Sequence, residues 1–401
     1  MPNIFNYFDK IKKGYKKNYR EIKAFKDRVY PQFIFDENLI TIKDDIPVFT
    51  LHSVNSEKFE NQLRYLNANG YKTINSSELY EYLIGNIPIT ERTIVLTFDD
   101  GWKNLYTVAF PLLKKYKFKA ICFLVANLII EDENKTQENF ENTNDSQNLL
   151  FPDSKIMCNW NEIREMEQSG VIDFQSHSMN HYLISTSSRV ENFLYPYYDS
   201  YAMNFDIPLY REKGSDNYTR NLLLGTPIYE NNSRFSEFKR FFDDETSRIF
   251  CINFVMENGG INFFKKFNWK KILLKQFQDY VKKNGNIGFY ESENDQRESI
   301  FNEMYNSKIV IEKKLNKKVE HFCYPWWVGS ELAMEISKEV GYLTNFWGII
   351  QNKRSNSKGS DPFKIVRILS DDLIYRLPGI ERKSIVKILI DRYLFEIKTK
   401  V

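Results

Sequence analysis

Short runs of apolar and β-branched residues alternate with amphipathic segments along much of the chain. The apolar runs show no polar alternation, which is typical of strands buried on both faces of a parallel sheet. The segments between them repeat apolar residues every three or four positions and predict helices. The expected strands are residues 46–51, 93–98, 120–125, 171–174, 319–324, 343–346 and 365–369, and the expected helices are residues 59–66, 78–83, 105–116, 162–168, 298–315 and 331–340. This order predicts an α/β fold with a parallel sheet.

One long region breaks the alternation. Residues 187–295 are rich in Tyr, Phe and Asn, and we expect one clear helix among them, at 269–283. We interpret this region as an insertion that forms a lid or a substrate-binding part. The polar stretch at 131–155 is expected to be a surface loop. The expected organisation is a basic N-terminal helical arm, a first part of the main domain, the insertion, a second part of the main domain and a C-terminal helix, at residues 1–45, 46–186, 187–295, 296–375 and 376–401.

The N-terminal segment has a basic amphipathic pattern. Apolar residues recur every three or four positions over residues 3–29, and residues 10–28 hold nine Lys or Arg against two acidic residues. Such a helix can pack on the main domain with a solvated basic face, or lie on an anionic membrane surface. Gly14 interrupts the pattern and several Asn dilute it, which favours packing on the domain. Peripheral contact with a membrane stays open as the alternative.

Composition and charge narrow the classes of function. Hydrophobic residues make up 42% of the 401 residues and aromatic residues 16%, which is enough for a large core and unlike a disordered or collagen-like chain. Lys and Arg number 56 against 53 Asp and Glu, so the net charge of +3 does not indicate a nucleic-acid partner. The four cysteines are scattered without a CxxC pair, which predicts free thiols in a reducing compartment.

The start of the sequence has no apolar run of signal-peptide length, and no stretch of 18 consecutive apolar residues predicts a membrane span. We therefore expect a cytoplasmic protein, with a peripheral position at the inner face of the membrane if the N-terminal helix binds lipid. On this expectation the substrate is a molecule inside the cell.

Two acidic residues follow an expected strand in the segment TFDDG, residues 97–101. The carboxyl ends of parallel strands are where α/β barrels place their catalytic groups. The adjacent carboxylates of Asp99 and Asp100 repel each other unless a cation neutralises one of them, and Gly101 allows a sharp turn. The same residues are also ordinary turn chemistry. Taken alone, the segment leaves a functional site and a structural turn equally open.

Two of the four histidines lie four residues apart in the segment HSMNH, residues 177–181, just after another expected strand. Residues i and i+4 share one face of a helical turn, so the two imidazoles can bind one divalent metal ion. Two imidazoles and one carboxylate with an open position suit a catalytic zinc or a non-haem iron. Either Asp99 or Asp100 would complete the ligands, and the other would act as a general base on metal-bound water.

Together these motifs resemble the polysaccharide deacetylases of carbohydrate esterase family four, which share the NodB-homology domain. FCYPWW at residues 322–327 is similar to a third family motif, although many members carry an Arg where Cys323 stands. LHSV at 51–54 and GYKTI at 70–74 resemble the opening of a circularly permuted branch, whose catalytic His comes from the first strand. The resemblance implies a distorted (β/α) barrel of about seven parallel strands, of NodB type, with a large insertion and helical termini.

The resemblance implies a role for each matching residue. Asp100, His177 and His181 would bind one divalent metal ion, which in this family is usually Zn²⁺. Asp99 would be the base that deprotonates the bound water, and His52 would be the acid that protonates the departing amine. An acetamide is a poor electrophile with a poor leaving group. It needs a Lewis acid, a hydroxide equivalent and a proton for the amine, and these residues supply the three.

The residues of the third motif, FCYPWW, would contact the substrate. We expect Tyr324, Trp326 and Trp327 beside the substrate, with the backbone N–H of Trp326 helping to hold the oxyanion. For the two tryptophans, core packing and an aromatic wall for a sugar ring remain equally open. His321, at the polar edge of the strand, is expected to be structural. The Arg that orients the base in other members is missing, and the sequence does not identify the group that holds Asp99.

The leading hypothesis is a metal-dependent deacetylase of N-acetylated sugars or of polysaccharide and glycoconjugate precursors. One alternative keeps the fold but hydrolyses other non-peptide C–N bonds, in small amides or imides, with the insertion closing the site into a pocket. The other alternative is an inactive glycan-binding homologue, and the intact set of site residues argues against it. We expect a carbohydrate as the substrate partner and no nucleic acid.

Overall fold

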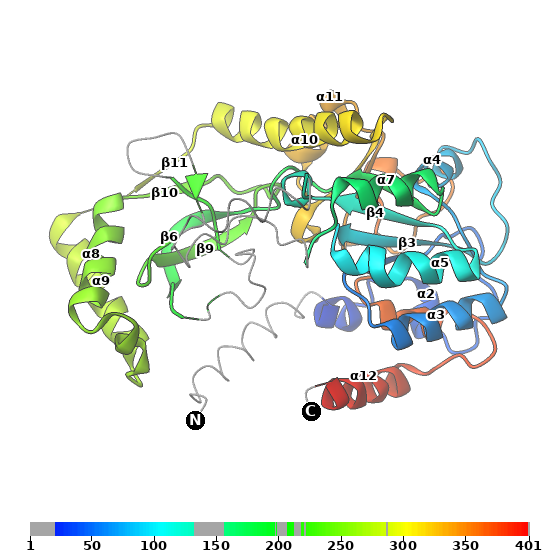
Figure 1. Cartoon of the computed structure of the whole chain (residues 1–401), viewed down its shortest axis with the longest axis horizontal. Coiled ribbons are helices and arrows are strands. Elements are labelled where there is room, and N and C mark those ends of the chain that lie inside the picture. Colours follow the sequence, from blue (N-terminus) through cyan, green and yellow to red (C-terminus); the bar gives the residue numbers. More distant parts are fainter. Residues whose placement is uncertain are drawn as a thin grey trace.

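A curled sheet of parallel strands forms the centre of the main domain, which lies on the right of Figure 1. The computed structural model describes residues 21–131, 156–196, 198, 207–211, 218–219, 222–285 and 288–399. The strands of the sheet are β1 (Val48–Leu51), β2 (Lys72–Thr73), β3 (Thr93–Asp100), β4 (Ala120–Leu124), β5 (Ile172–Ser176), β12 (His321–Cys323) and β13 (Thr344–Phe346). Their order is β1-β3-β4-β5-β12-β13, with β2 also paired to β3, and all these pairings are parallel.

Residues 365–368 close this sheet into a distorted barrel. Ile365 forms a parallel bridge with Phe346 of β13, and Ile368 forms one with Phe49 of β1. The segment therefore lies between the two edge strands of the sheet. The expected distorted (β/α) barrel is confirmed, and the apolar run expected as its last strand is the closing segment.

Helices join the strands of the barrel. They are α3 (Ser56–Ala68), α4 (Ser76–Leu83), α5 (Phe110–Tyr116), α7 (Trp160–Gln168), α10 (Glu293–Leu315) and α11 (Glu331–Val340). Before α5, the helix expected at 105–116 opens as a π-helical turn, η1 (Leu105–Ala109). Pro111 in the next turn has no N–H to donate, which accounts for the wider turn before it. Shorter helices are α2 (Gln32–Phe35), η2 (Ala126–Leu128), η4 (Pro325–Trp327), η5 (Pro362–Lys364) and η6 (Asp371–Arg376).

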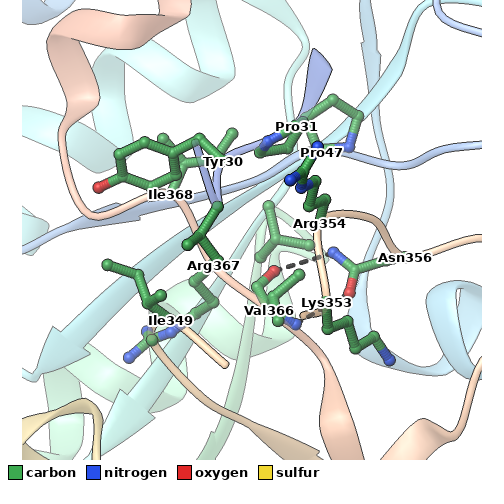
Figure 2. A pocket seen from close by; sticks show the side chains of 13 residues that line it. Tyr30, Pro31, Pro47, Ile349, Lys353, Arg354, Asn356, Val366, Arg367 and Ile368 are labelled. Carbon is green, nitrogen blue, oxygen red and sulfur yellow. Dashed lines mark hydrogen bonds between the residues drawn. The ribbon is translucent and has the colours of Figure 1, made fainter. Parts of the chain in front are cut away.

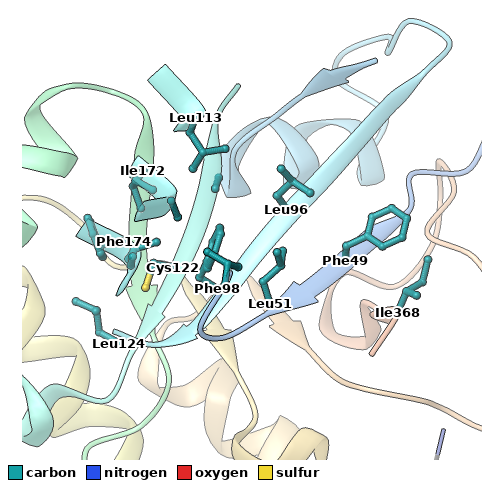
Figure 3. Packing of buried hydrophobic residues seen from close by; sticks show 14 of the residues in the cluster. Phe49, Leu51, Leu96, Phe98, Leu113, Cys122, Leu124, Ile172, Phe174 and Ile368 are labelled. Atoms are coloured by element: carbon teal, nitrogen blue, oxygen red, sulfur yellow. The ribbon is translucent and has the colours of Figure 1, made fainter. Parts of the chain in front are cut away.

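Both faces of the sheet are buried, because neighbouring residues of β3 enter different hydrophobic clusters. Leu96 and Phe98 join the cluster that also holds Leu113 of α5, which lies between the sheet and the helices (Figure 3). Val95 joins a second cluster, inside the barrel. Its members include residues of several strands (Val48, Ile121, Phe123, Cys323 and Phe346), Ile365 of the closing segment, and Leu79, Tyr82 and Leu83 of α4. Burial on both faces is the reason why these strands are continuous apolar runs in the sequence.

The insertion has a separate hydrophobic core, on the left of Figure 1. Its elements are β6 (Leu183–Phe193), β7 (Tyr210–Arg211), β8 (Tyr218–Thr219), β9 (Pro227–Ser233), β10 (Phe241–Asp243), α8 (Glu245–Glu257), η3 (Gly260–Lys265), α9 (Trp269–Asn284) and β11 (Gly288–Tyr290). The expected helix at 269–283 is present as α9, but α8 corrects the expectation of a single helix. The apolar residues of α8 are spread around it, with Ile249 and Met256 exposed and Val255 buried, so its sequence lacks the helical stripe.

The expected domain boundaries do not fall in loops. The boundary at 186/187 falls inside β6 and the boundary at 295/296 falls inside α10, so these two elements connect the barrel and the insertion without a break. At the ends, residues 21–26 are helical and α12 (Ile385–Thr399) is the C-terminal helix. Residues 3–20 of the expected N-terminal helix, and residues 132–155 of the expected loop, lie outside the described residues. In the described part of the chain, no helix has both the length and the apolar character needed to cross a membrane.

Candidate active site

The residues singled out in the sequence meet at the carboxyl ends of the parallel strands. Asp99 and Asp100 end β3, His177 directly follows β5, and His52 directly follows β1. His181 returns to the same place four residues later. In barrels of this type the loops at this edge carry the chemistry, while the opposite edge contributes stability. The fold therefore brings all five polar side chains into one site.

Three of these side chains form a group that could hold a metal ion. Nε2 of His177 and Nε2 of His181 each lie 3.7 Å from Oδ1 of Asp100, and all three ligand atoms lie within 4.8 Å of one another. Ligands bound at about 2.0–2.2 Å to one tetrahedral ion are themselves about 3–4 Å apart. Oδ1 of Asp100 is buried and accepts no hydrogen bond from any described residue. A cation between the three atoms would satisfy this oxygen, so the residues fit a divalent metal.

Hydrogen bonds from neighbouring groups orient two of these ligands. Nδ1 of His177 lies 2.8 Å from the carbonyl oxygen of Cys323, so Nδ1 carries the proton and the lone pair of Nε2 points to the site. Burial lowers the pKa of His177 to about 4, which keeps the imidazole neutral and able to bind metal. Nε1 of Trp102 donates to Oδ2 of Asp100 at 2.9 Å. Sequence reasoning missed Trp102, although its place two residues after Asp100 was a usable signal.

Asp99 lies beside the three ligands without being one of them. Its Oδ2 is 3.8 Å from Nε2 of His177 and 4.0 Å from Nε2 of His52. Burial alone would raise the pKa of Asp99, but the charge of Arg367, followed by the two histidines, holds the pKa below its ordinary value. Asp99 is therefore an ionised carboxylate, as a general base must be.

Arg367 is the group that holds Asp99, and sequence reasoning did not find it. Nη1 of Arg367 donates to Oδ1 of Asp99 at 2.7 Å and to Oγ1 of Thr97 at 3.3 Å. Nε of Arg367 donates to the carbonyl oxygen of Trp347 at 3.1 Å. The arginine comes from the segment that closes the barrel. It stands where an arginine is needed to orient the base, a role that the resemblance gives to an Arg of the third motif in other members.

The backbone next to Arg367 is fixed from the other side. The buried side chain of Asn356 accepts a hydrogen bond from the N–H of Val366 and donates one to its carbonyl, each at 2.9 Å. Figure 2 shows this contact at a small cavity that Tyr30 and Lys353 also line. None of the metal-cluster residues lines this cavity, so it is not the candidate active site.

Cys323 stands where many family members have the Arg, and it belongs to a second group that could bind metal, with Asp99 and His177. Burial raises the pKa of the Cys323 thiol well above its ordinary value. The thiol therefore stays protonated, whereas a metal requires the thiolate. The group around Asp100, whose Oδ1 accepts no hydrogen bond from any described residue, therefore fits a divalent metal better. All four cysteines are buried as free thiols.

The residues of the third motif separate into two groups. The ring of Trp326 lies 5.1 Å from that of His181, and the ring of Trp327 meets His52 edge-on at 6.0 Å, so both tryptophans flank the site. Tyr324 is fully buried, and its hydroxyl donates to Oδ1 of Asn345 at 3.0 Å. We expected Tyr324 beside the substrate. Its side chain packs in the core instead, on the side opposite to that of the preceding residue, Cys323.

His321 lies at the opposite end of β12 from the site. It is buried, and its Nδ1 lies 2.9 Å from Oγ1 of Thr344. Burial lowers the pKa of His321 to about 4. The residue is structural, as we expected from the sequence.

Comparisons with known proteins fit this geometry. Residues 86–193 match a family model described as polysaccharide deacetylase. Over 148 residues the chain is 27% identical to the poly-beta-1,6-N-acetyl-D-glucosamine N-deacetylase of Escherichia coli (strain K12), which is 37% of this chain and 21% of that protein. The protein of the same name from Staphylococcus aureus (strain MRSA252) is 28% identical over 139 residues, 34% of this chain and 41% of that protein. The chain thus spans less than half the length of either relative.

A solved structure shares the fold over most of its length. It is the de-N-acetylase from Aggregatibacter actinomycetemcomitans, which aligns with a TM-score of 0.50 and 17% identity over 82% of this chain and 95% of that chain. The matching family model covers Asp99 and the three residues Asp100, His177 and His181. The barrel described above is therefore similar to polysaccharide deacetylases in the sequence of residues 86–193 and in its fold.

Proposed function

We propose that the protein is a metal-dependent hydrolase that removes acetyl groups from N-acetylated sugars within a polysaccharide or glycoconjugate. The observation that carries this proposal is the arrangement around Asp99. Its carboxylate is held in its ionised form by Arg367 and stands between the three metal-binding side chains and His52. This arrangement supplies a base, an acid and a place for a Lewis acid within one buried site.

Zn²⁺ is the ion that we propose for the position between Asp100, His177 and His181. Two nitrogen ligands and one carboxylate oxygen leave a fourth tetrahedral position open, which is typical of catalytic zinc sites. A bound divalent ion at this position supplies a Lewis acid for the acetyl carbonyl and makes water a stronger acid.

The other groups move the protons. Arg367 occupies Oδ1 of Asp99, so Oδ2 is the oxygen that accepts the proton of the attacking water. His52 stands 4.0 Å from this oxygen, and 41% of its side chain is exposed, so it can reach both Asp99 and a bound substrate. In the second half of the reaction the C–N bond breaks and His52 protonates the amine nitrogen. The products are acetate and the free amine of the sugar.

The sugar class rests on the relatives and on the aromatic residues at the site. The two curated relatives are named as deacetylases of poly-beta-1,6-N-acetyl-D-glucosamine. Trp327 is partly exposed next to His52 and offers an aromatic face to a sugar ring. These observations favour an N-acetylhexosamine polymer over a small amide or imide.

Acetate release from purified protein tests the proposal. Oligomers of β-1,6-linked N-acetylglucosamine would be incubated with the full chain, after metal removal by a chelator and again after Zn²⁺ is added back. We expect acetate release only with metal present. Asp99→Asn should reduce the rate at least about 100-fold because the base is lost.

Asp44→Asn is a matched control, because Asp44 is exposed and is proposed neither as a metal ligand nor as an acid or base. It should keep the wild-type rate. Asp99→Asn that releases acetate as fast as wild type would overturn the mechanism. Zn²⁺-loaded protein that cleaves small amides but none of the oligomers would replace the proposed substrate class by the alternative one.

A further inference from the structure

The loop that carries the two histidine ligands has an unfavourable backbone. Residues 177–181 form no helix or strand, and Ser178 and His181 have positive φ angles of 76° and 52°. Residues with a Cβ atom rarely adopt this region, because it is sterically unfavourable for them. The loop must therefore be held in this shape by contacts with the rest of the structure.

The first half of the loop is held by the side chain of Ser178 and by the short helix η2, which follows β4. The N–H of His181 donates to Oγ of Ser178 at 3.0 Å. The N–H of Ala126 donates to the carbonyl of Ser178 at 3.2 Å, and that of Asn127 donates to the carbonyl of Met179 at 3.0 Å. These bonds fix the middle of the loop, but they leave the donors of Met179 and Asn180 to be satisfied by another element.

That element is helix α10, and the residue is Glu303. Its backbone carbonyl accepts from the N–H of Met179 at 3.1 Å. Its buried carboxylate accepts from the N–H of Asn180 at 3.0 Å, through Oε2, and from Nδ2 of Asn180 at 2.5 Å, through Oε1. One residue of α10 therefore accepts three hydrogen bonds from the two residues immediately before His181.

Glu303 is the centre of a polar stripe on α10. Residues 299, 303 and 307 are spaced by four, so they share one face of the helix. The hydroxyl of Ser299 lies 2.9 Å from that of Tyr182, and the hydroxyl of Ser307 lies 2.7 Å from that of Ser176. The stripe thus contacts the residues on both sides of His181 and the residue before His177. In Figure 1 this helix runs along the top of the molecule, between insertion and barrel.

We propose that Glu303 is a positioning residue, which acts through Asn180 to set the position of the metal ligand His181. This inference rests on the proposed metal site. A carboxylate is needed here because both partners are donors, and hydrogen bonds to a charged acceptor are the stronger kind. The amide of Gln would keep the volume but turn an NH₂ group toward one of the donors of Asn180. His181 would then lose its fixed place relative to Asp100.

Zn²⁺ affinity of the full chain, measured in competition with a chromogenic chelator, tests the proposal. Glu303→Gln should bind Zn²⁺ about 10- to 100-fold more weakly than wild type, which is the usual effect of losing a partner that orients a ligand. The visible spectrum of Co²⁺ bound in place of Zn²⁺ should also change, since it reports the ligand geometry. Glu298→Gln is the matched control, because Glu298 is exposed on the same helix, and its affinity and spectrum should equal those of wild type.

A second variant removes the side-chain bonds of Asn180. Asn180→Ala loses the bond from Nδ2 to Glu303 and the bond that Oδ1 accepts from Nδ2 of Asn127 at 2.6 Å, but it keeps the backbone N–H. Its affinity for Zn²⁺ should fall by several-fold, whereas Asn127→Ala, which removes only the bond from the exposed Asn127, should stay near wild type. In the double variant Glu303→Gln with Asn180→Ala, the loss should be smaller than the sum of the two single losses, since both changes break the bond between Glu303 and Asn180. If Glu303→Gln does not fold, the spectrum and affinity of Asn180→Ala, compared with those of Asn127→Ala, decide the question.

The outcomes separate this inference from the proposed function. Wild-type affinity and an unchanged Co²⁺ spectrum in Glu303→Gln, or in Asn180→Ala, would overturn the positioning role while the proposed function stands. Wild-type protein that binds no Zn²⁺ would overturn the proposed metal site and the positioning role with it. A drop in affinity with a shifted spectrum supports both.

Discussion

Arg367 donates a hydrogen bond from Nη1 to Oδ1 of Asp99 across 2.7 Å, and both side chains are fully buried. The two residues are 268 positions apart in the sequence. The arginine comes from the segment that closes the barrel, and the aspartate comes from the end of β3. A buried ion pair of this kind need not add stability, but it makes the ionised form of Asp99 tolerable inside the protein.

Removing only one partner of this pair should be costly. Arg367→Met leaves the Asp99 carboxylate buried without its counter-charge, so we expect the free energy of unfolding of the metal-free protein to fall by about 3–5 kcal/mol. The measurement is denaturant unfolding at pH 7. The double variant Arg367→Met with Asp99→Asn removes both charges and should be more stable than Arg367→Met alone. A double variant that is less stable than the single one would contradict the role of the pair.

The indole of Trp102 should matter for metal binding rather than for folding. Trp102→Phe keeps an aromatic ring but removes the donor to Oδ2 of Asp100. We expect about 10- to 100-fold weaker Zn²⁺ binding, measured by competition with a chelator. Trp347→Phe is the matched control, because the indole of Trp347 donates to the carbonyl of Phe363, outside the metal group. Equal affinities of the two variants would show that the indole of Trp102 does not orient Asp100.

Local patterns predicted the elements that carry the site, because strands buried on both faces and an HxxxH segment are visible over a few residues. The same patterns did not predict Arg367 or Glu303. Both act through hydrogen bonds to residues more than 120 positions away, and such contacts depend on how the barrel closes and how α10 crosses it. An Arg or Glu in these segments has no local feature that distinguishes it from a surface charge.

The misplaced expectation at Tyr324 has a similar cause. Tyr324 stands only two residues before Trp326 in the motif, but the chain turns sharply after Pro325, and Trp326 and Trp327 have φ angles of 59° and 60°. This turn directs the two tryptophans to the site while Tyr324 stays in the core. Helix α8 was missed for a different reason: its apolar residues are not confined to one face, so it lacks the periodicity that identifies a helix.

Trp327 should affect substrate binding more than the chemical step. The Trp327 side chain packs closely against Gly348. A Cβ atom added to Gly348 would lie 2.5 Å from Cβ of Trp327, so no space is left between the two residues. If the ring forms a wall for a sugar, Trp327→Ala should raise KM for the oligomers about 3- to 10-fold, in line with about 0.5–1.5 kcal/mol for an aromatic contact, with a smaller change in kcat. Steady-state kinetics check this. A loss of thermal stability with unchanged KM would instead indicate core packing.

The stability of the metal-free protein should depend on pH through His321. Burial lowers the pKa of His321 to about 4 in the folded state, whereas the unfolded chain takes up this proton near the ordinary histidine pKa of 6.5. Below pH 6.5 the unfolded state therefore binds more protons than the folded state, and the free energy of unfolding falls as the pH falls toward 4. Above pH 6.5 both forms are neutral and the effect is absent.

His321→Gln removes the contribution of His321 to the pH dependence of the free energy of unfolding. It keeps a side chain that can form a hydrogen bond with Oγ1 of Thr344. Between pH 7 and pH 5 the variant should lose about 2 kcal/mol less stability than wild type, as the linkage relation gives for one such histidine. Denaturant unfolding of the metal-free proteins at the two pH values provides the comparison. His177, whose pKa burial also lowers to about 4, should leave a residual dependence in the variant. Equal losses in the two proteins would mean that His321 already takes up its proton in the folded state near its ordinary pKa.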